Sequence, residues 1–224
     1  REFADKVVDN GPQGLGKRRG FIHARAGLHR GQEWDQARGA FARAADVDTR
    51  GFGDALRLAY QARPEIFAKE IILPEQLYER VIEIDERMSA KGEVRHEPDI
   101  AALESALAQA RAAGIDSVAI VLMHAWRNPD HETAVEAACE KAGFSQISVS
   151  HKVSPLIKLV GRGDTTVVDA YLTPILKRYV TRVANALGAS TEDEKAPSLQ
   201  FMMSSGGLTA AEMFEGKDAI LSSL

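Results

Sequence analysis

Cysteine is almost missing from this chain of 224 residues, since Cys139 is the single one. One cysteine cannot close a disulfide within the chain, which excludes a small scaffold held together by disulfides. This usage is typical of a reducing compartment, so we expect the protein to be cytoplasmic. Cys139 falls in a helical pattern, where we expect a small buried or half-buried residue.

Long apolar runs and an excess of positive charge are missing too. No apolar run approaches the roughly 18 residues that a membrane helix needs, and the charged beginning of the chain has no apolar signal-peptide core. A formal net charge of -4 gives no electrostatic reason to expect nucleic acid as a partner. Hydrophobic residues make up 45% of the chain, which is enough for a proper core. The sequence therefore predicts a globular protein that binds neither membrane nor nucleic acid.

The first 48 residues show little apolar periodicity. The basic, glycine-rich stretch 11–20 suggests a phosphate-binding loop, but its spacing is not G-x-x-x-x-G-K-[ST] and no apolar strand precedes it. We expect residues 1–48 to be irregular, with a short helix over 33–45 as the regular element most compatible with the pattern.

From residue 49 onward, strand patterns alternate with helix patterns. The continuous apolar run 117–123 is typical of a strand that is covered on both faces. Such an alternation predicts an α/β protein with a largely parallel sheet. The expected strands are 78–87, 94–98, 117–123, 146–150 and 199–203, and the expected helices are 100–113, 128–143, 165–187 and 210–216.

Capping residues mark the ends of two of these helices. Asp99 is expected to cap the first of them, and Gly114 stands at the position just past its end, where glycine is favoured. Asn128 is expected to cap the next helix, with Pro129 in its first turn.

Polar residues follow three of the expected strands, at the sheet edge where ligands bind in such folds, and the first two of these groups contain histidines. His124 and His131 could form a metal pair, but no carboxylate or third histidine has a fitting spacing, so we favour structural roles. Ser150 and His151 are adjacent in sequence, which does not place a nucleophile against a base, and no G-x-S-x-G motif is present. We favour structural roles for this pair as well.

The segment from Arg162 to Thr166 is expected to open a long helix. Asp164 or Thr165 would cap that helix, and the free backbone N–H groups at its start would suit an anion. The Arg-Gly-Asp triplet inside this segment is also an adhesion motif, which we interpret as coincidence. We expect Asp169, further along the same pattern, to be a packing residue and not a catalyst.

A Ser-Ser-Gly-Gly turn follows the strand expected at 199–203. Glycines let backbone N–H groups approach an anion closely, and serine hydroxyls add further donors. The turn consists of Ser204, Ser205, Gly206 and Gly207. Taken alone, such a sequence is most often a tight turn.

Nine segments, in order over residues 49–222, resemble the hydantoinase A/5-oxoprolinase family. They are Thr49–Leu56, Gln61–Pro64, Pro74–Glu79 with Glu83–Arg87, Val121–Trp126 with His131 and Glu132, Gly143–Phe144, Ile147–Ser150 with Val153–Ile157, Arg162–Tyr179, Phe201–Leu208 and Gly216–Ser222. The residues from Gly163 to Pro174 favour the oxoprolinase-like branch of that family.

The resemblance implies an actin/Hsp70-like (ribonuclease H-like) ATPase fold, present here as a fragment. It divides the chain into a non-family segment 1–48, the end of the family's N-terminal region at 49–150, and the start of its ATPase region at 151–224. It implies ATP- and Mg²⁺-dependent ring opening of 5-oxo-L-proline to L-glutamate.

The same resemblance implies partners and sites. The substrate would be a small cyclic amide, 5-oxoproline or hydantoin. The partner would be a hydantoinase B-type subunit or a fused half, and the resemblance leaves open whether the chain also forms a homo-oligomer. Arg162, Asp164 and Thr165 are expected to be catalytic, near substrate or phosphate. Ser204, Ser205, Gly206 and Gly207 are expected near the nucleotide.

Two phosphate-binding motifs of the family have no counterpart in this sequence. The family's opening Asp-x-Gly-Gly-Thr loop would precede residue 49, and a second Asp-Gly-Gly motif would follow residue 222. We therefore expect the chain alone not to turn over ATP. The alternatives are a non-catalytic truncated or frameshifted fragment, and a subunit of the acetone-carboxylase or N-methylhydantoinase type.

Overall fold

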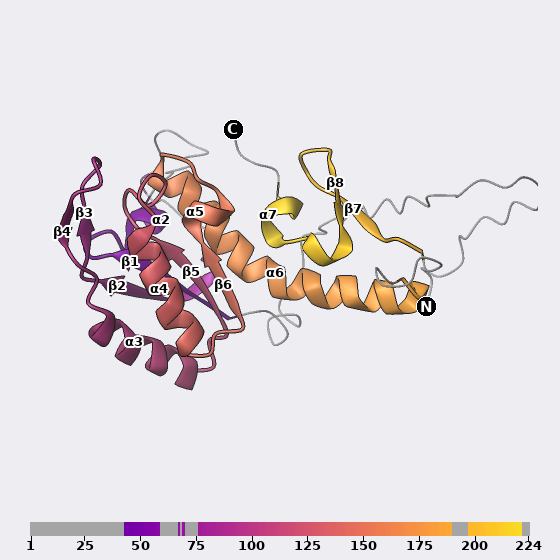
Figure 1. Ribbon diagram of the computed structural model, residues 1–224, viewed down its shortest axis with the longest axis horizontal. Coiled ribbons are helices and arrows are strands. Elements are labelled where there is room, and N and C mark those ends of the chain that lie inside the picture. Colours follow the sequence, from indigo (N-terminus) through magenta and orange to yellow (C-terminus); the bar gives the residue numbers. More distant parts are fainter. Residues whose placement is uncertain (1–42, 59–66, 68, 70–75, 190–196, 221–224) are drawn as a thin grey trace, which may run out of the picture.

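The computed structural model of the protein describes residues 43–58, 67, 69, 76–189 and 197–220. Four parallel strands form its main sheet in the order β2-β1-β5-β6 (Figure 1). The strands are β1 (Ala44–Thr49), β2 (Tyr78–Ile84), β5 (Ser117–Val121) and β6 (Gln146–Val149). The predicted α/β class with a parallel sheet is confirmed.

Strand β1 occupies an inner position of the sheet, with Asp46 beside Val81 of β2 and Ala119 of β5. All of its six residues are buried. The expectation that residues 44–48 are irregular is therefore wrong. Asp46 and Asp48 interrupt the apolar pattern that would otherwise have marked a buried strand. Residues 1–42 lie outside the described part of the chain, and the end of the helix expected over 33–45 is wrong, because β1 begins at Ala44.

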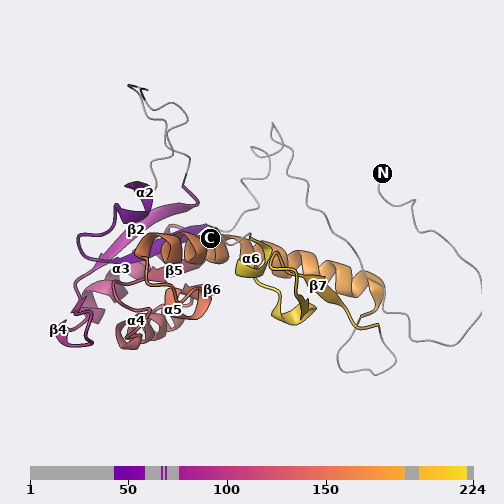
Figure 2. The same cartoon turned by 90° about the horizontal axis from the view of Figure 1, so that it is seen from above.

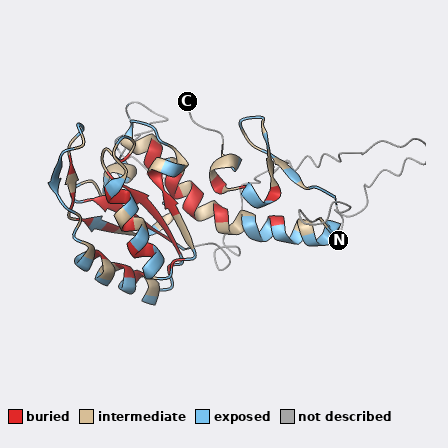
Figure 3. Cartoon of the chain, viewed as in Figure 1, coloured by how far each residue is buried: buried red, intermediate tan, exposed pale blue. Residues whose placement is uncertain are grey.

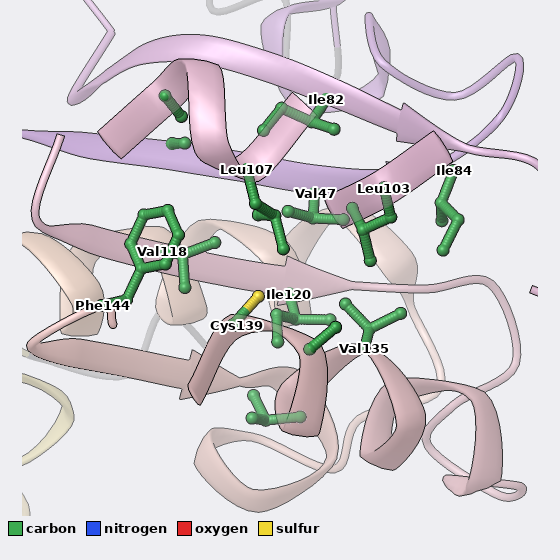
Figure 4. Close-up of a cluster of buried hydrophobic side chains, with 14 of the residues drawn as sticks. Val47, Ile82, Ile84, Leu103, Leu107, Val118, Ile120, Val135, Cys139 and Phe144 are labelled. Carbon is green, nitrogen blue, oxygen red and sulfur yellow. The ribbon is translucent and has the colours of Figure 1, made fainter. Parts of the chain in front are cut away.

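Two helices cover one face of the sheet. They are α3 (Ile100–Ala112) and α4 (Asp130–Lys141), and their apolar side chains meet those of the strands in the main core (Figure 4). The core includes Val47, Ile82, Ile84, Leu103, Leu107, Val118, Ile120, Val135, Cys139 and Phe144. Burying one such leucine or isoleucine side chain contributes about 2 kcal/mol. Cys139 is buried in this core, as expected.

The opposite face of the sheet packs against one long helix, α6 (Leu159–Leu187). Because side chains alternate along a strand, Ala119 points away from the main core and contacts Val167 and Ala170 of α6. Asp46 pairs in register with Ala119, so Asp46 and Asp48 also face α6. The sheet is thus covered on both sides, which explains why its central strands are buried.

The cap of α3 is confirmed, and that of α4 is not. The Ala102 N–H donates to Asp99 Oδ1 at 3.0 Å, and Gly114 takes a left-handed φ of 82° just past the helix. At α4 the residue before the helix is Pro129, which offers no side-chain cap. Asn128 instead belongs to the preceding turn, where its N–H donates to the His124 carbonyl at 3.1 Å.

A small hairpin stands apart from the sheet. It pairs β3 (Arg87–Met88) with β4 (Val94–His96), whereas the expected strand 78–87 belongs mostly to β2 of the main sheet. Two short helices, α2 (Ala55–Leu58) and α5 (Ser150–Val153), follow β1 and β6.

Helix α6 continues well beyond the sheet, and its far half carries the C-terminal elements (Figures 1 and 2). These are the antiparallel pair β7 (Gln200–Met202) and β8 (Leu208–Ala210), the 3₁₀ turn η2 (Ala211–Met213) and α7 (Gly216–Ala219). The helix expected over 210–216 is therefore replaced by the end of a strand, a 3₁₀ turn and the first residue of α7. A small core of Val180, Ala211 and Phe214 holds this part together, and much of the surrounding surface is exposed (Figure 3).

None of the helices in the described ranges has the length and apolar character that crossing a membrane requires.

Candidate functional site

A pocket of about 350 Å³ lies where the start of α6 meets the β7–β8 turn and α7. One wall comes from α5, the loop after it and the first turns of α6, and the other comes from the turn and α7. Its lining residues are Val153, Ser154, Leu156, Gly161, Thr165, Ser204, Ser205, Lys217, Asp218 and Ile220. The pocket therefore combines apolar side chains with hydroxyls, one lysine and one aspartate.

The structure brings three of the seven predicted site residues to this pocket. Thr165 lines the wall on α6, and Ser204 and Ser205 line the opposite wall. The other four, Arg162, Asp164, Gly206 and Gly207, are not among its lining residues. Residues nearly 40 positions apart in sequence are thus neighbours across one cavity, and the roles assigned to all seven remain predictions.

The expected start of α6 is wrong by about six residues. The helix begins at Leu159, with the extended Lys158 as its cap position, so Asp164 and Thr165 lie in the helix and cap nothing. The Thr165 hydroxyl donates to the Gly161 carbonyl at 2.9 Å, one turn earlier. Burial raises the pKa of the Asp164 carboxyl. The N–H groups of this segment are not free for an anion, because they belong to the helix interior.

Arg162 is fully buried beneath the pocket wall. Its Nε donates to Ser150 Oγ at 2.8 Å, its Nη2 to the Leu122 carbonyl at 2.7 Å and its Nη1 to the Leu156 carbonyl at 2.7 Å. Burial lowers the pKa of the guanidinium, while the negative charges of Glu132 and Asp48 act in the opposite direction. Arg162 thus joins the ends of β5 and β6 to the loop that forms the pocket.

Glu132, at the start of α4, is the acceptor at the centre of the same network. Its Oε1 accepts from the Leu122 N–H at 2.9 Å and from the Ser150 hydroxyl at 2.6 Å. Its Oε2 accepts from the N–H of His151 at 3.0 Å and contacts His151 Nδ1 at 2.7 Å. The structural interpretation of Ser150 and His151 fits this geometry, because both residues are bound to a buried carboxylate.

His131 belongs to a second buried network, and not to a metal pair with His124. Its Nδ1 lies 2.6 Å from Glu86 Oε2, and the Thr49 hydroxyl donates to the other oxygen of Glu86. His124 takes a left-handed φ of 64° after β5, which is uncommon for a residue other than glycine.

Asp46 and Asp48 are buried close to each other, and the positive charge of Arg162 offsets only part of the cost of burying Asp48. In the part of the chain that the structure describes, none of their four carboxyl oxygens has a hydrogen-bond partner, and neither has the Tyr78 hydroxyl. Burial raises the pKa of Asp46 to about 7, and burial together with the charge of Asp46 raises the pKa of Asp48 to about 9. Burial likewise raises the pKa of Tyr78 to about 12. These groups favour their neutral forms because nearby charges do not compensate for lost water.

The Ser204–Gly207 turn is tied to α7 through Ser204. The Ser204 N–H donates to the Asp218 carbonyl at 2.8 Å, and its hydroxyl donates to the carbonyls of Asp218 and Ile220. Gly206 closes the turn with a left-handed φ of 89° and donates its N–H to the Met203 carbonyl at 2.9 Å. This left-handed backbone conformation favours glycine at position 206 independently of any role of the turn in binding.

The pocket lining in the described ranges offers few free groups to a nucleotide. The described ranges contain no group of three or more His, Cys, Asp or Glu residues that could hold a metal ion. The hydroxyls of Thr165 and Ser204 already donate to backbone carbonyls, and the Lys217 ammonium lies 2.7 Å from Glu215. Ser205 and Lys217 could contact one anionic group, which is fewer contacts than the three phosphates of a nucleotide would need.

Comparison with known proteins defines the class to which this fold and pocket belong. The family model for the hydantoinase/oxoprolinase N-terminal region matches residues 23–143, and the hydantoinase/oxoprolinase model matches residues 162–223. The chain belongs to the hydantoinase/oxoprolinase family. The family recognised from the sequence is therefore confirmed, while the division of the chain at residues 49 and 150 stays a prediction.

Among its curated relatives is the 5-oxoprolinase of Saccharomyces cerevisiae, which is 36% identical over 207 residues. That match covers 80% of this chain and 16% of the relative, so the chain spans about a sixth of the relative's length. The caprolactamase subunit alpha of Pseudomonas jessenii is 37% identical over 87 residues, covering 38% of this chain and 12% of the relative.

Two solved structures share the fold. The ATP-dependent caprolactamase of Pseudomonas jessenii matches with a TM-score of 0.67 and 29% identity, over 81% of this chain and 27% of that one. A nucleotide-free acetone carboxylase matches with a TM-score of 0.67 and 19% identity, over 84% and 28%. The predicted actin-like ATPase fold, present here in part, is confirmed.

Proposed function

We propose that this chain is part of an ATP-dependent hydrolase of the 5-oxoprolinase type, which opens 5-oxo-L-proline to L-glutamate. The observation that carries the proposal is the 36% identity to a 5-oxoprolinase over most of the chain. The pocket between α6 and α7 supports it, since its size suits a small ring and its lining offers both apolar and hydrogen-bonding groups.

The chemistry requires that a stable amide become a better electrophile. When bound, ATP and Mg²⁺ would supply phosphorylation of the lactam oxygen, after which water can attack the amide carbon. The residues of this chain would contribute positioning. Thr165, Ser204 and Ser205 line one cavity from opposite walls, and Arg162 with Glu132 holds one of those walls in place.

The other predicted site residues keep their assignments within this proposal. Asp164 would lie near substrate or phosphate on the helix that forms one wall. Gly206 and Gly207 would let the turn approach the nucleotide. A hydantoinase B-type subunit or fused half would supply the remaining machinery, and self-association of the chain is also compatible with the proposal.

The second candidate substrate is a lactam without a carboxylate group, such as caprolactam. It is favoured by the structural likeness to an ATP-dependent caprolactamase at 29% identity. An acetone-carboxylase or N-methylhydantoinase type of subunit remains a further alternative on the family resemblance, as does a fragment without catalytic activity.

Thermal unfolding with ligands tests the proposal. We expect Mg-ATP together with 5-oxoproline to raise the unfolding midpoint of the chain saturably, because binding to the native state stabilises it. Caprolactam tests the neutral alternative, and L-proline, which has the ring without the amide carbonyl, is the control. A cooperative transition that none of these compounds shifts would contradict a binding-competent pocket.

Turnover is a separate prediction. Because this chain spans only about a sixth of the length of its 5-oxoprolinase relative, we expect this chain alone to release no ADP above background. A coupled ADP assay with and without 5-oxoproline checks this. ATP hydrolysis that depends on 5-oxoproline would refute the expectation.

A further inference from the structure

The backbone of α7 rests directly on α6 through two buried side chains. The Gly216 N–H donates to Thr173 Oγ1 at 2.8 Å, and the Lys217 N–H donates to Asp169 Oδ1 at 2.8 Å. The Thr173 hydroxyl in turn donates to Asp169 Oδ1 at 3.1 Å. Thr173 is fully buried and Asp169 is 2% exposed, so water does not compete for these bonds.

The contact is so close that position 216 tolerates only glycine. A Cβ atom at Gly216 would lie 2.8 Å from Asp169 Cα and 2.9 Å from the Asp169 carbonyl oxygen. Both atoms are backbone, so a side chain there could be accommodated only if the two elements moved apart. The missing side chain is what lets the N–H groups of α7 reach the acceptors on α6.

This contact connects the main sheet to the far wall of the pocket. Asp169 Oδ2 accepts from the hydroxyl of Ser148 on β6 at 2.7 Å, which fixes the carboxylate to the sheet. On the other side, Lys217 and Asp218 line the pocket, and Ser204 is bonded to the Asp218 carbonyl. Hydrogen bonds therefore link the sheet to Asp169 and Asp169 to Lys217, and the next residue, Asp218, is hydrogen-bonded to the Ser204 turn.

We propose that Asp169 and Thr173 are positioning residues that hold α7 and the Ser204–Gly207 turn against α6, and so set the width of the pocket. Neither residue lines the pocket itself, and both act through the backbone N–H groups of Gly216 and Lys217. The link to ligand binding rests on the proposed function; the placement of the wall does not. Asp169, expected from the sequence to be a packing residue, has this additional role.

Two variants of the whole chain test the contact. Thr173→Val keeps the shape of the side chain and removes the acceptor for the Gly216 N–H, and Gly216→Ala adds the atom that the contact excludes. Thr173→Ser keeps the hydroxyl and serves as the conservative variant. Thr181→Val is the matched control, because the Thr181 hydroxyl donates to the Lys177 carbonyl of its own helix at 2.8 Å, in an exposed position.

Amide hydrogen exchange, resolved by residue, is the primary measurement. In Thr173→Val and Gly216→Ala we expect exchange to accelerate at least about tenfold at residue 216 and across 200–210, since a buried donor loses its partner. Amides of β5 should be unchanged, and Thr173→Ser and Thr181→Val should behave as wild type. The rise in unfolding midpoint caused by Mg-ATP and 5-oxoproline should shrink in the first two variants only.

Two results would overturn the proposal: unchanged exchange across 200–210 in both disruptive variants, or equal acceleration in β5, which would mean loss of the whole fold. Unchanged ligand stabilisation despite accelerated exchange would overturn the role in setting the pocket. If the wild-type chain shows no ligand-induced rise, the proposed function fails for this chain, and the exchange measurement still decides whether Asp169 and Thr173 position the wall.

Discussion

The two buried aspartates of β1 should make this protein less stable as the pH rises. Asp46 and Asp48 have no hydrogen-bond partner among the described residues, and burial raises their pKa values to about 7 and about 9. In an unfolded chain an aspartate has a pKa of about 3.9. Between the unfolded and native pKa values, the native state holds protons that the unfolded state has released. The contribution of the two protonated aspartates to the free energy of unfolding is therefore complete below about pH 4, and it is lost as the pH rises through the native pKa values.

The magnitude follows from proton linkage. Each proton retained by the native state alone lowers the free energy of unfolding by about 1.4 kcal/mol per pH unit of increase. Counting a single proton for the coupled pair, the loss between pH 5 and pH 7 is about 3 kcal/mol, a large share of the roughly 5–15 kcal/mol typical of a domain. The charged or titratable groups that interact electrostatically with the pair are Tyr78, Glu83, Arg162 and Asp164.

Urea unfolding followed by circular dichroism at pH 5, 6, 7 and 8 measures this slope. The double variant Asp46→Asn/Asp48→Asn cannot ionise at these positions and should lose most of the slope. Asp54→Asn, which changes an exposed aspartate, should keep it. If wild type and the double variant show the same dependence on pH, the assignment of the effect to Asp46 and Asp48 is refuted.

Further substitutions test the packing around the site, each by the shift of the urea midpoint. In wild type, backbone N–H groups donate to both carboxylate oxygens of Glu132, and Glu132→Gln would set an amide N–H₂ against one of these donors. We expect this variant to destabilise the fold by about 1–3 kcal/mol. An unchanged urea midpoint would mean that Glu132 is not the centre of its network. Gly163→Val should cost about 1–3 kcal/mol through overpacking, since a Cβ there would crowd Leu56 and lie 3.2 Å from Val121 Cγ1; wild-type stability would show that Leu56 yields freely. Asp99→Ala should cost about 1 kcal/mol through loss of the cap of α3, and a larger loss would mean that Asp99 does more than cap.

Local signals in the sequence were sufficient for some elements of the fold. Asp99 and Gly114 bracket α3 because a cap and a left-handed glycine are properties of a few neighbouring residues. The apolar run at 117–123 was an equally local signal, and it correctly indicated the buried strand β5. By contrast, β1 could not be found, since two aspartates on a buried strand contradict the pattern on which the prediction depends.

The site required contacts that sequence patterns do not encode. Thr165, Ser204 and Ser205 were predicted, but their meeting across one pocket depends on the path of the chain between them. Glycines and polar residues from 161 to 166 suggested a helix start, whereas the helix had already begun, because Gly163 is needed for close packing against Leu56. The buried roles of Glu132 and Asp169 could not be read from a charged residue in a helical pattern.

The length of α6 has a mechanical consequence. At 1.5 Å per residue, its 29 residues extend over about 43 Å, from the edge of the sheet to the far end of the C-terminal elements. A tilt of about 5° at Leu159 would displace the other end by about 4 Å, the size of a side chain. A tilt of a few degrees at the sheet end of α6 therefore becomes a displacement of several ångströms at the C-terminal elements.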